Sequence, residues 1–127
     1  MNLQTNRKHI MLVDDDEDVA ELLGFVLRRA GFEVSCASNV RDAMAELARS
    51  SVPDLFILDL QMPELDGDYL LRWLRNEQKF EQPILMLTGK VRPGVEEHLK
   101  ALGADAVAHK PIDIQSLNAL VQELLMQ

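Results

Sequence analysis

Carboxylates, a hydroxyl and an ammonium group follow short apolar runs at regular places in this 127-residue chain. Asp14 and Asp15 come directly after the first run, Asp59 after the third, Thr88 after the fourth and Lys110 after the fifth. If each run is a strand of one parallel sheet, its polar follower lies at the carboxyl end of that strand, where ligands bind in open α/β sheets. We therefore expect these side chains to meet in one small volume.

Three carboxylates in that volume need a positive charge between them. Two like charges 4 Å apart repel each other by about 4 kcal/mol at an effective dielectric constant near 20. Asp14, Asp15 and Asp59 therefore require a cation or a proton. An all-oxygen ligand set that keeps several waters suits Mg²⁺, so the sequence predicts a magnesium site.

A divalent ion at these acids would draw a phosphoryl group to the same place, because it bridges carboxylate and phosphate oxygens. Lys110 offers a positive charge to the phosphoryl oxygens, and Thr88 offers a hydroxyl donor. Asp59 stands singly on the central strand, between the acidic pair and the lysine, and is the candidate nucleophile that becomes an acyl phosphate. Such a labile product suits a reversible signal better than a structural mark.

The elements that must position these groups form a strict alternation. The apolar runs are too continuous for half-exposed strands and are typical of strands covered on both faces; they are Ile10–Val13, Phe32–Cys36, Leu55–Leu58, Ile84–Leu87 and Ala106–Ala108. Apolar residues with helical spacing lie after each run, in the segments Val19–Leu27, Val40–Ala48, Tyr69–Leu74, Val95–Leu102 and Ile114–Leu125. The pattern predicts an α/β fold, a parallel five-stranded sheet between two helical layers, with the common strand order 2-1-3-4-5.

Turn and capping residues agree with this alternation. Gly31 and Gly103 each stand between a helical segment and the next apolar run, where a left-handed residue ends a helix. Ser38 or Asn39 is expected to cap the second helix, and Asp113 the fifth.

Length and composition narrow the class of protein. We expect residues 1–127 to form one domain, and the formal net charge of −8 argues against direct nucleic-acid binding by it. No apolar run is long enough to cross a membrane, and the N-terminal segment lacks a secretory pattern. The single cysteine fits a reducing compartment, so we expect a cytoplasmic location and no membrane partner.

Five segments in their order resemble the receiver domain of two-component response regulators, the CheY-like family. They are Ile10–Asp16, Asp54–Gly67, Pro83–Gly89, Gly103–Asp105 and Lys110–Pro111. Each motif is weak alone, but their joint spacing is specific and covers essentially the whole chain. The resemblance implies the flavodoxin-like (βα)₅ fold, a three-layer sandwich.

The resemblance also implies a role for each acidic residue. Asp59 would be the phosphoacceptor. Asp14 and Asp15 would form the acidic pair that holds Mg²⁺, with Asp15 as a direct ligand, and the backbone carbonyl of Gln61 would complete the protein's share of the metal shell.

Other positions bear on the phosphoryl group. The resemblance makes Thr88 the switch hydroxyl and Lys110 the phosphoryl-pairing lysine, and it implies a cis peptide bond from Lys110 to Pro111. Gln61 and Lys90 would flank the phosphoryl group and influence how fast water attacks it. Val107 stands where the family often has Tyr or Phe, so the usual coupling of the threonine to an aromatic ring does not carry over.

The function implied is that of a phosphoacceptor module rather than an enzyme. It would take a phosphoryl group from a sensor histidine kinase or phosphotransfer protein and catalyse only its own phosphorylation and dephosphorylation. The surface of the fourth helix, fifth strand and fifth helix would then change toward a downstream effector or output domain. The kinase, an output domain after Gln127 and homodimerisation through the last two helices cannot be read from the sequence.

Two other functions fit parts of the pattern. A Mg²⁺-dependent phosphatase with an aspartyl nucleophile usually carries a second Asp two residues later as general acid, where this chain has Gln61. It would also need a substrate cap, for which the chain is short. A flavin-binding module of similar fold needs a phosphate loop after the first strand, where the acids at Asp14–Asp16 would repel a phosphate.

Overall fold

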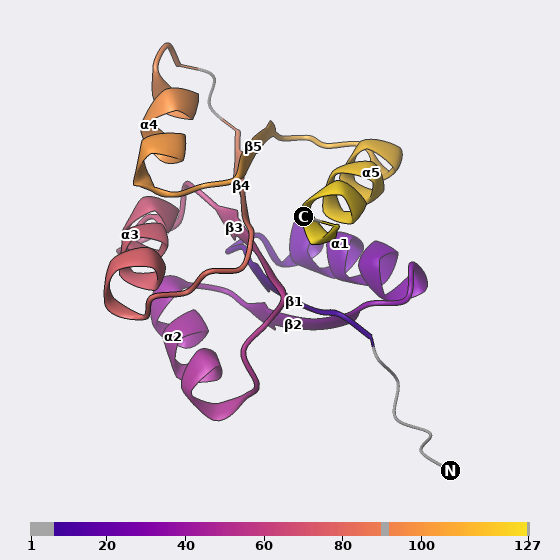
Figure 1. The fold of residues 1–127 in the computed structure, drawn as a ribbon. Helices are drawn as coiled ribbons and strands as arrows, with labels where there is room; N and C mark the ends of the chain where they lie inside the picture. Colours follow the sequence, from indigo (N-terminus) through magenta and orange to yellow (C-terminus); the bar gives the residue numbers. More distant parts are fainter. Residues whose placement is uncertain (1–6, 90–91, 127) are drawn as a thin grey trace.

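The computed structural model describes residues 7–89 and 92–126, and Figure 1 shows their arrangement. Five strands lie parallel in the order β2-β1-β3-β4-β5, as the sequence predicts. Their bounds are β1 His9–Val13, β2 Glu33–Ala37, β3 Leu55–Asp59, β4 Ile84–Thr88 and β5 Ala106–His109. Each bound differs from the predicted one by at most one residue.

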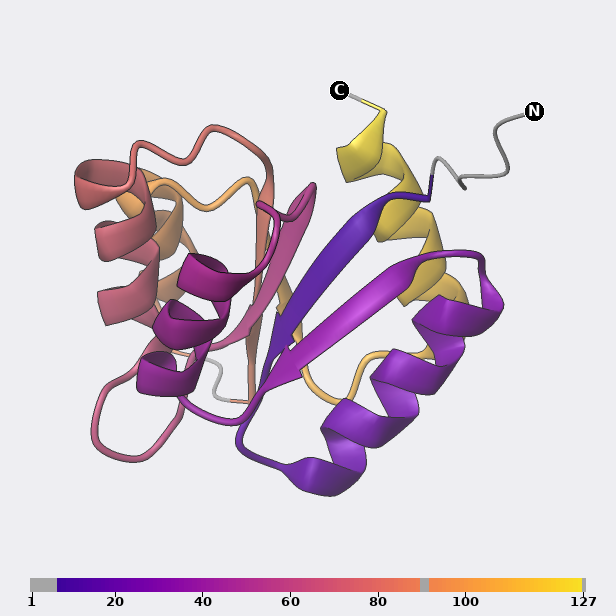
Figure 2. The ribbon, with the colours of Figure 1, turned by 90° about the horizontal axis from the view of Figure 1, so that it is seen from below.

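Helices cover both faces of the sheet, which makes the fold a three-layer, flavodoxin-like sandwich. Figures 1 and 2 show α1 and α5 on one face and α2, α3 and α4 on the other. The helices are α1 Glu17–Arg29, α2 Val40–Arg49, α3 Gly67–Arg72, α4 Val95–Leu102 and α5 Ile114–Leu125, and α3 continues as a π-helical segment, η1, over Trp73–Glu77. Within the described residues, no helix combines the length and the apolar character that crossing a membrane requires.

The central strands contribute side chains to two separate hydrophobic cores, one on each face of the sheet. Met11 and Phe56 pack toward α2, α3 and α4. Their neighbours Leu12 and Ile57 pack toward α1 and α5. Because successive strand residues point to opposite faces and both faces are covered, every residue of β1 and β3 is buried. This double burial explains why the apolar runs of the central strands show no alternation with polar residues. The prediction that all five strands are covered on both faces is wrong for β2 and β5, which lie at the edges of the sheet and are partly exposed.

The caps are those that the sequence predicts. Gly31 and Gly103 follow α1 and α4 with φ of 103° and 120°, values that residues with a Cβ rarely adopt. Asn39, rather than Ser38, caps α2 through its side-chain oxygen. Asp113 caps α5 in the same way.

The predicted apolar helix faces are partly wrong at their edges. Leu22 and Ile114 are 55% and 50% exposed. In α3 the predicted apolar face consists of Tyr69, Leu70, Trp73 and Leu74. Tyr69 is exposed, whereas Leu71, which is not on that predicted face, is fully buried. A helix turns by about 100° per residue, so an error of one position in the centre of an apolar face exchanges a buried residue for an exposed one.

The segment Gly103–Asp105 has a structural role, far from the carboxyl ends of the strands. The Arg75 guanidinium in η1 donates to the Gly103 carbonyl oxygen at 3.0 Å and to Asp105 Oδ2 at 2.8 Å. Asp105 Oδ2 also accepts the backbone N–H of Ile84, the first residue of β4, at 2.9 Å. One half-buried guanidinium thus connects η1, the start of β4 and the turn between α4 and β5, a contact that the sequence did not predict.

Candidate functional site

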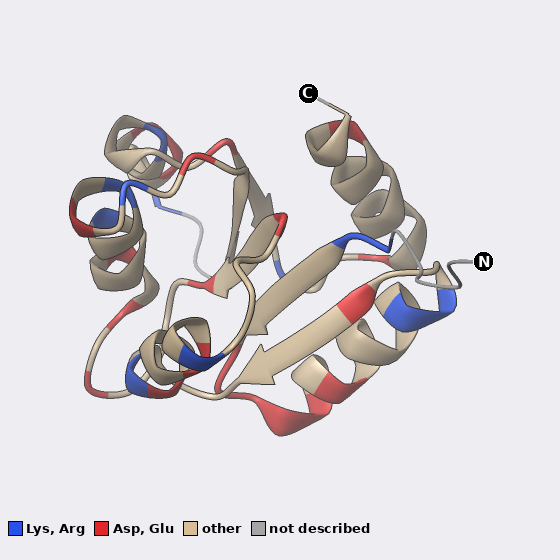
Figure 3. Cartoon of the chain, turned by 60° about the horizontal axis from the view of Figure 1, so that its bottom comes forward, with Lys and Arg blue, Asp and Glu red and all other residues tan. Residues whose placement is uncertain are grey.

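The acidic residues meet at the carboxyl ends of two neighbouring strands. β1 and β3 pair with Val13 opposite Leu58, so Asp14 and Asp59 leave the sheet side by side. One carboxylate oxygen from each of Asp14, Asp15 and Asp59 lies within 4.8 Å of the others. Figure 3 shows acidic residues gathered at this end of the sheet, where α1 begins. The predicted convergence of the three acids is therefore present.

Backbone hydrogen bonds hold Asp14 in place. Its N–H donates to the Ala37 carbonyl oxygen at 3.1 Å, which extends the pairing of β1 with β2 by one residue. Its Oδ1 accepts the backbone N–H of Asp16 at 2.9 Å. Asp16 itself caps α1, accepting the N–H groups of Asp18 and Val19. Asp16 therefore serves the helix, whereas Asp14, only 1% exposed, turns inward to the cluster.

Lys110 reaches the same cluster from β5. Its backbone N–H donates to the Thr88 carbonyl oxygen at 2.8 Å, and this hydrogen bond holds the segment after β5 against the end of β4. Its Nζ lies 2.8 Å from Asp14 Oδ2 and 3.4 Å from Asp59 Oδ1. The peptide bond from Lys110 to Pro111 is cis, as the family resemblance implies.

Burial and charge alter the proton affinity of this cluster. Burial, and after it the negative charge of Asp14, raise the pKa of the Asp59 carboxyl to about 7, although the Lys110 ammonium acts in the opposite direction. Burial by itself would lower the pKa of Lys110, but its hydrogen bond to Asp14 and the charges of Asp59 and Asp14 outweigh burial and raise it. The lysine therefore stays charged.

Thr88 ends β4 and is fully buried. The side chain of Gln61, in the loop after β3, lies against it: Gln61 Nε2 donates to Thr88 Oγ1 at 3.2 Å. Gln61 Oε1 accepts the backbone N–H of Gly89 at 3.2 Å. The sequence predicts for Gln61 a backbone carbonyl that binds the metal and a place beside the phosphoryl group, but not this side-chain bridge. The predicted flanking residue Lys90 lies outside the described residues.

Gly67 allows the loop after β3 to fold back against the acceptor strand. Its N–H donates to the Leu60 carbonyl oxygen at 2.9 Å. A Cβ at this position would overlap the backbone carbonyl oxygen of Asp59. The Asp66–Gly67 pair in the motif therefore reflects a close approach of two backbone segments beside the candidate nucleophile.

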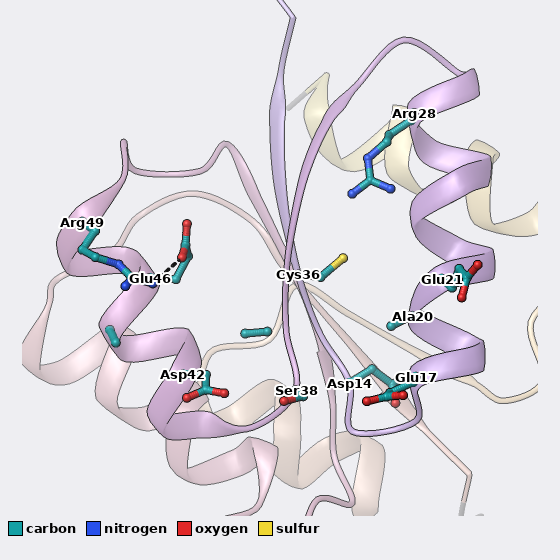
Figure 4. Close-up of a pocket in the computed structure, with 12 residues that line it drawn as sticks. Asp14, Glu17, Ala20, Glu21, Arg28, Cys36, Ser38, Asp42, Glu46 and Arg49 are labelled. Carbon is teal, nitrogen blue, oxygen red and sulfur yellow. Dashed lines mark hydrogen bonds and ion pairs between the residues drawn. The ribbon is translucent and has the colours of Figure 1, made fainter.

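A separate groove of about 610 Å³ runs between α1 and α2 across β2. Figure 4 shows Glu17 and Asp42 near Asp14 at one end, and Arg28 and Arg49 at the other. Of the three clustered acids only Asp14 borders the groove. The groove is therefore distinct from the place where Asp59 and Lys110 meet.

Comparisons with known proteins agree with this geometry. The family model described as response regulator receiver domain matches residues 10–122. The alkaline phosphatase synthesis transcriptional regulatory protein PhoP of Bacillus subtilis is 39% identical over 118 residues, which are 93% of this chain and 48% of PhoP. The transcriptional regulatory protein GltR of Pseudomonas aeruginosa is 37% identical over 124 residues, 97% of this chain and 51% of GltR. The chain thus spans about half the length of these curated relatives.

Solved structures give the same result. The chemotaxis protein CheY4 of Vibrio cholerae superposes with a TM-score of 0.85 at 30% identity, covering 93% of this chain and 98% of CheY4. The signal receiver domain of a signal transduction histidine kinase from Syntrophus aciditrophicus gives a TM-score of 0.84 at 32% identity, with coverages of 94% and 90%. The resemblance noted from the motifs therefore extends to the whole fold.

Proposed function

Because this chain belongs to the family of response regulator receiver domains, which are signalling domains of two-component systems, we propose that it accepts a phosphoryl group on Asp59. The donor would be a sensor histidine kinase or a phosphotransfer protein, acting in the cytoplasm. Residues 1–127 would form one receiver domain, which catalyses only its own phosphorylation and dephosphorylation.

One geometric observation carries this proposal. Asp59 is 3% exposed, shares its surroundings with Asp14 and Asp15, and has the Lys110 ammonium 3.4 Å from its Oδ1. On one side of this carboxylate lie acids that can hold a metal ion. On its other side lies the Lys110 ammonium, which can pair with phosphoryl oxygens. Both oxygens of Asp14 are already engaged, Oδ1 by the Asp16 N–H and Oδ2 by Lys110 Nζ, which supports Asp59 rather than Asp14 as the acceptor.

Receiver domains bind Mg²⁺ at an acidic pocket, and the donors of this cluster fit that ion. Asp14, Asp15 and Asp59 supply only carboxylate oxygens, which a hard divalent cation prefers. With the backbone carbonyl of Gln61 they would form the protein's share of the ligand shell. The bound ion would neutralise the acids and supply positive charge toward an incoming phosphoryl group.

In the proposed transfer, an Asp59 oxygen attacks the phosphorus of a phosphohistidine. A P–O bond forms, the P–N bond breaks, and the imidazole nitrogen keeps the electron pair of that bond. Lys110 stabilises the negative charge of the phosphoryl oxygens, and the Thr88 hydroxyl donates a hydrogen bond to one of them. Both residues lie at the ends of neighbouring strands, which the hydrogen bond from the Lys110 N–H to the Thr88 carbonyl oxygen holds together.

When the Thr88 hydroxyl binds the phosphoryl group, we expect the surface formed by α4, β5 and α5 to change as well. The Lys110 N–H bond to the Thr88 carbonyl connects the ends of β4 and β5 directly. Val107, in β5, has no aromatic ring that could swing inward with the hydroxyl. We therefore propose that phosphorylation moves the residues directly after β4. A downstream effector, an output domain or a second copy of this chain would recognise the changed surface.

The phosphatase alternative is not favoured. The position two residues after Asp59 holds Gln61, whose amide cannot act as the general acid that such an enzyme needs.

Incubation with Mg²⁺ and acetyl phosphate tests the proposal. Intact-mass spectrometry is expected to show one added phosphoryl group that is absent from Asp59→Asn. Asp66→Asn is the matched control, because Asp66 is an exposed acid of the same loop whose side chain makes no capping hydrogen bond. Labelling of Asp59→Asn at the wild-type level, or sustained phosphate release from unrelated monoesters, would refute the proposal.

A further inference from the structure

The Gln61 amide joins two loops directly beside the acidic cluster. Its Nε2 donates to Thr88 Oγ1 at 3.2 Å, and its Oε1 lies 3.4 Å from the same hydroxyl, within reach of the hydroxyl proton. The same Oε1 accepts the Gly89 N–H at 3.2 Å. Both polar atoms of one side chain thus contact the end of β4, across 27 residues of sequence.

These contacts compete with the function proposed for Thr88. A hydroxyl has one proton to donate. When that proton points to Gln61 Oε1, it cannot also point to a phosphoryl oxygen on Asp59. Because Thr88 is fully buried, its hydroxyl must exchange one protein partner for the phosphoryl group rather than turn freely in water.

We propose that the Gln61 side chain is a positioning residue that holds the Thr88 hydroxyl and the Gly89 N–H in the unphosphorylated arrangement. This inference rests on the proposed function and extends it. It differs from an influence on water attack, because it concerns the resting protein before any phosphoryl group is present. Phosphorylation must break the hydrogen bond from the Thr88 hydroxyl to Gln61 Oε1, so the strength of this hydrogen bond helps to set how readily the end of β4 switches.

The test uses Gln61→Met, which keeps the length of the side chain but removes both polar atoms. A net hydrogen bond contributes modestly to stability, which corresponds to a change of about three- to tenfold in an equilibrium. We expect Gln61→Met to bind beryllofluoride, in saturating Mg²⁺, about three- to tenfold more tightly than the wild type. In the unphosphorylated, Mg²⁺-free protein, the Gly89 amide resonance should move upfield and exchange faster with solvent.

A second background separates positioning from a general effect on structure. In Thr88→Val the hydroxyl is gone and only the Gly89 N–H contact remains, so adding Gln61→Met should tighten beryllofluoride binding clearly less than it does in the wild-type background. A purely structural role would give the same change in both backgrounds. Gln78→Met, at an exposed glutamine beyond η1, is the control and should leave the Gly89 resonance and the affinity unchanged.

The outcomes distinguish this inference from the function on which it rests. If the wild type binds beryllofluoride but Gln61→Met neither tightens binding nor shifts the Gly89 amide, the positioning role is wrong and the receiver function stands. If the wild type binds no beryllofluoride and Asp59 takes no phosphoryl group, both are wrong. Tighter binding by Gln61→Met that is clearly smaller in the Thr88→Val background establishes the role of the amide.

Discussion

The Lys110 ammonium lies closer to Asp14 than to the candidate acceptor, at 2.8 Å from Asp14 Oδ2 and 3.4 Å from Asp59 Oδ1. In the metal-free protein this lysine is therefore first a counter-ion of a buried acid. A cation at the acidic cluster would take over that role, which would leave the ammonium available for the phosphoryl oxygens. The same side chain can thus serve the resting and the phosphorylated protein in turn.

Removal of the Lys110 charge should destabilise the metal-free protein. Lys110→Met leaves Asp14 and Asp59 buried without a counter-ion, which we expect to lower the free energy of unfolding by about 2–3 kcal/mol in EDTA. Saturating Mg²⁺ should recover most of this loss, because the ion supplies the missing positive charge. Urea denaturation with and without Mg²⁺ measures both values.

The matched control for that experiment is Lys100→Met. Lys100 pairs with Glu96 at 3.2 Å on the exposed side of α4, so its loss should cost less than about 0.5 kcal/mol with or without the ion. A loss at Lys110 that Mg²⁺ does not reduce would contradict the counter-ion role.

The raised pKa of Asp59 makes stability depend on pH in a defined direction. Its value of about 7, against 3.8 for an ordinary Asp, means that between these pH values the folded protein holds a proton that the unfolded chain has released. In EDTA, stability therefore falls as the pH rises through this window. Asp59→Asn is neutral throughout, so we expect it to be more stable than the wild type by on the order of 2 kcal/mol at pH 8.

That advantage of Asp59→Asn should shrink toward pH 5, where the wild-type carboxyl is itself protonated. Thermal or urea unfolding at pH 5 and pH 8 measures the difference, and Asp66→Asn should show no such trend. An advantage that is equal at both pH values would mean that Asp59 is already charged in the folded protein at pH 5.

The sheet and the meeting of the site residues could be predicted because their signals are local. Continuous apolar runs mark the buried strands, and the residue after each run must lie at the carboxyl end of its strand. The sheet alone therefore brings the site residues to one edge, independently of the loop conformations; these residues are Asp14, Asp59, Thr88 and Lys110. Glycines with positive φ at positions 31 and 103 fix the helix ends in the same local way.

What the sequence did not reveal depends on contacts between distant segments. The Gln61 amide reaches Thr88 across 27 residues, and Arg75 reaches Asp105 across 30. Neither contact follows from residue type or periodicity, because each depends on how two segments far apart in the sequence are placed relative to each other. The exposure of Leu22 is of the same kind, since it depends on which elements neighbour α1 rather than on α1 alone.

Arg75 should contribute more to stability than to phosphorylation. Its guanidinium is half-buried and donates to the carbonyl oxygens of Phe80 and Gln82 at 2.7 and 2.8 Å, besides its bonds to the turn before β5. We expect Arg75→Met to lower the free energy of unfolding by about 2–4 kcal/mol, because several acceptors lose their common donor at once. Labelling of Asp59 by acetyl phosphate, measured well below the melting temperature, should stay near the wild-type level.

Arg49→Met provides the comparison for Arg75. Arg49 pairs with Glu46 at 2.9 Å on the surface of α2, so its loss should cost less than about 0.5 kcal/mol. Equal destabilisation by the two variants would show that the Arg75 contacts add nothing beyond an ordinary surface pair.

Gly67 should be intolerant of any side chain, although it lies eight residues beyond the acceptor and has an ordinary φ. A Cβ there would overlap the Asp59 carbonyl oxygen and would lie 3.1 Å from the Leu60 Cα. Backbone cannot yield as a flexible side chain can, so Gly67→Ala must displace the end of β3 or the start of α3. We expect a loss of at least about 2 kcal/mol in the free energy of unfolding and slower labelling of Asp59.

Gly89→Ala is the matched substitution for Gly67→Ala, because a Cβ at Gly89 meets no atom of the described residues within 4 Å, its chain neighbours aside, and its N–H remains to bind Gln61. It should change stability by less than about 1 kcal/mol and leave labelling intact. Urea denaturation and acetyl phosphate labelling of the two variants side by side decide the matter. If Gly67→Ala proves as stable and as readily labelled as Gly89→Ala, the loop after β3 is able to move away from the acceptor strand, and the close approach at Gly67 does not position Asp59.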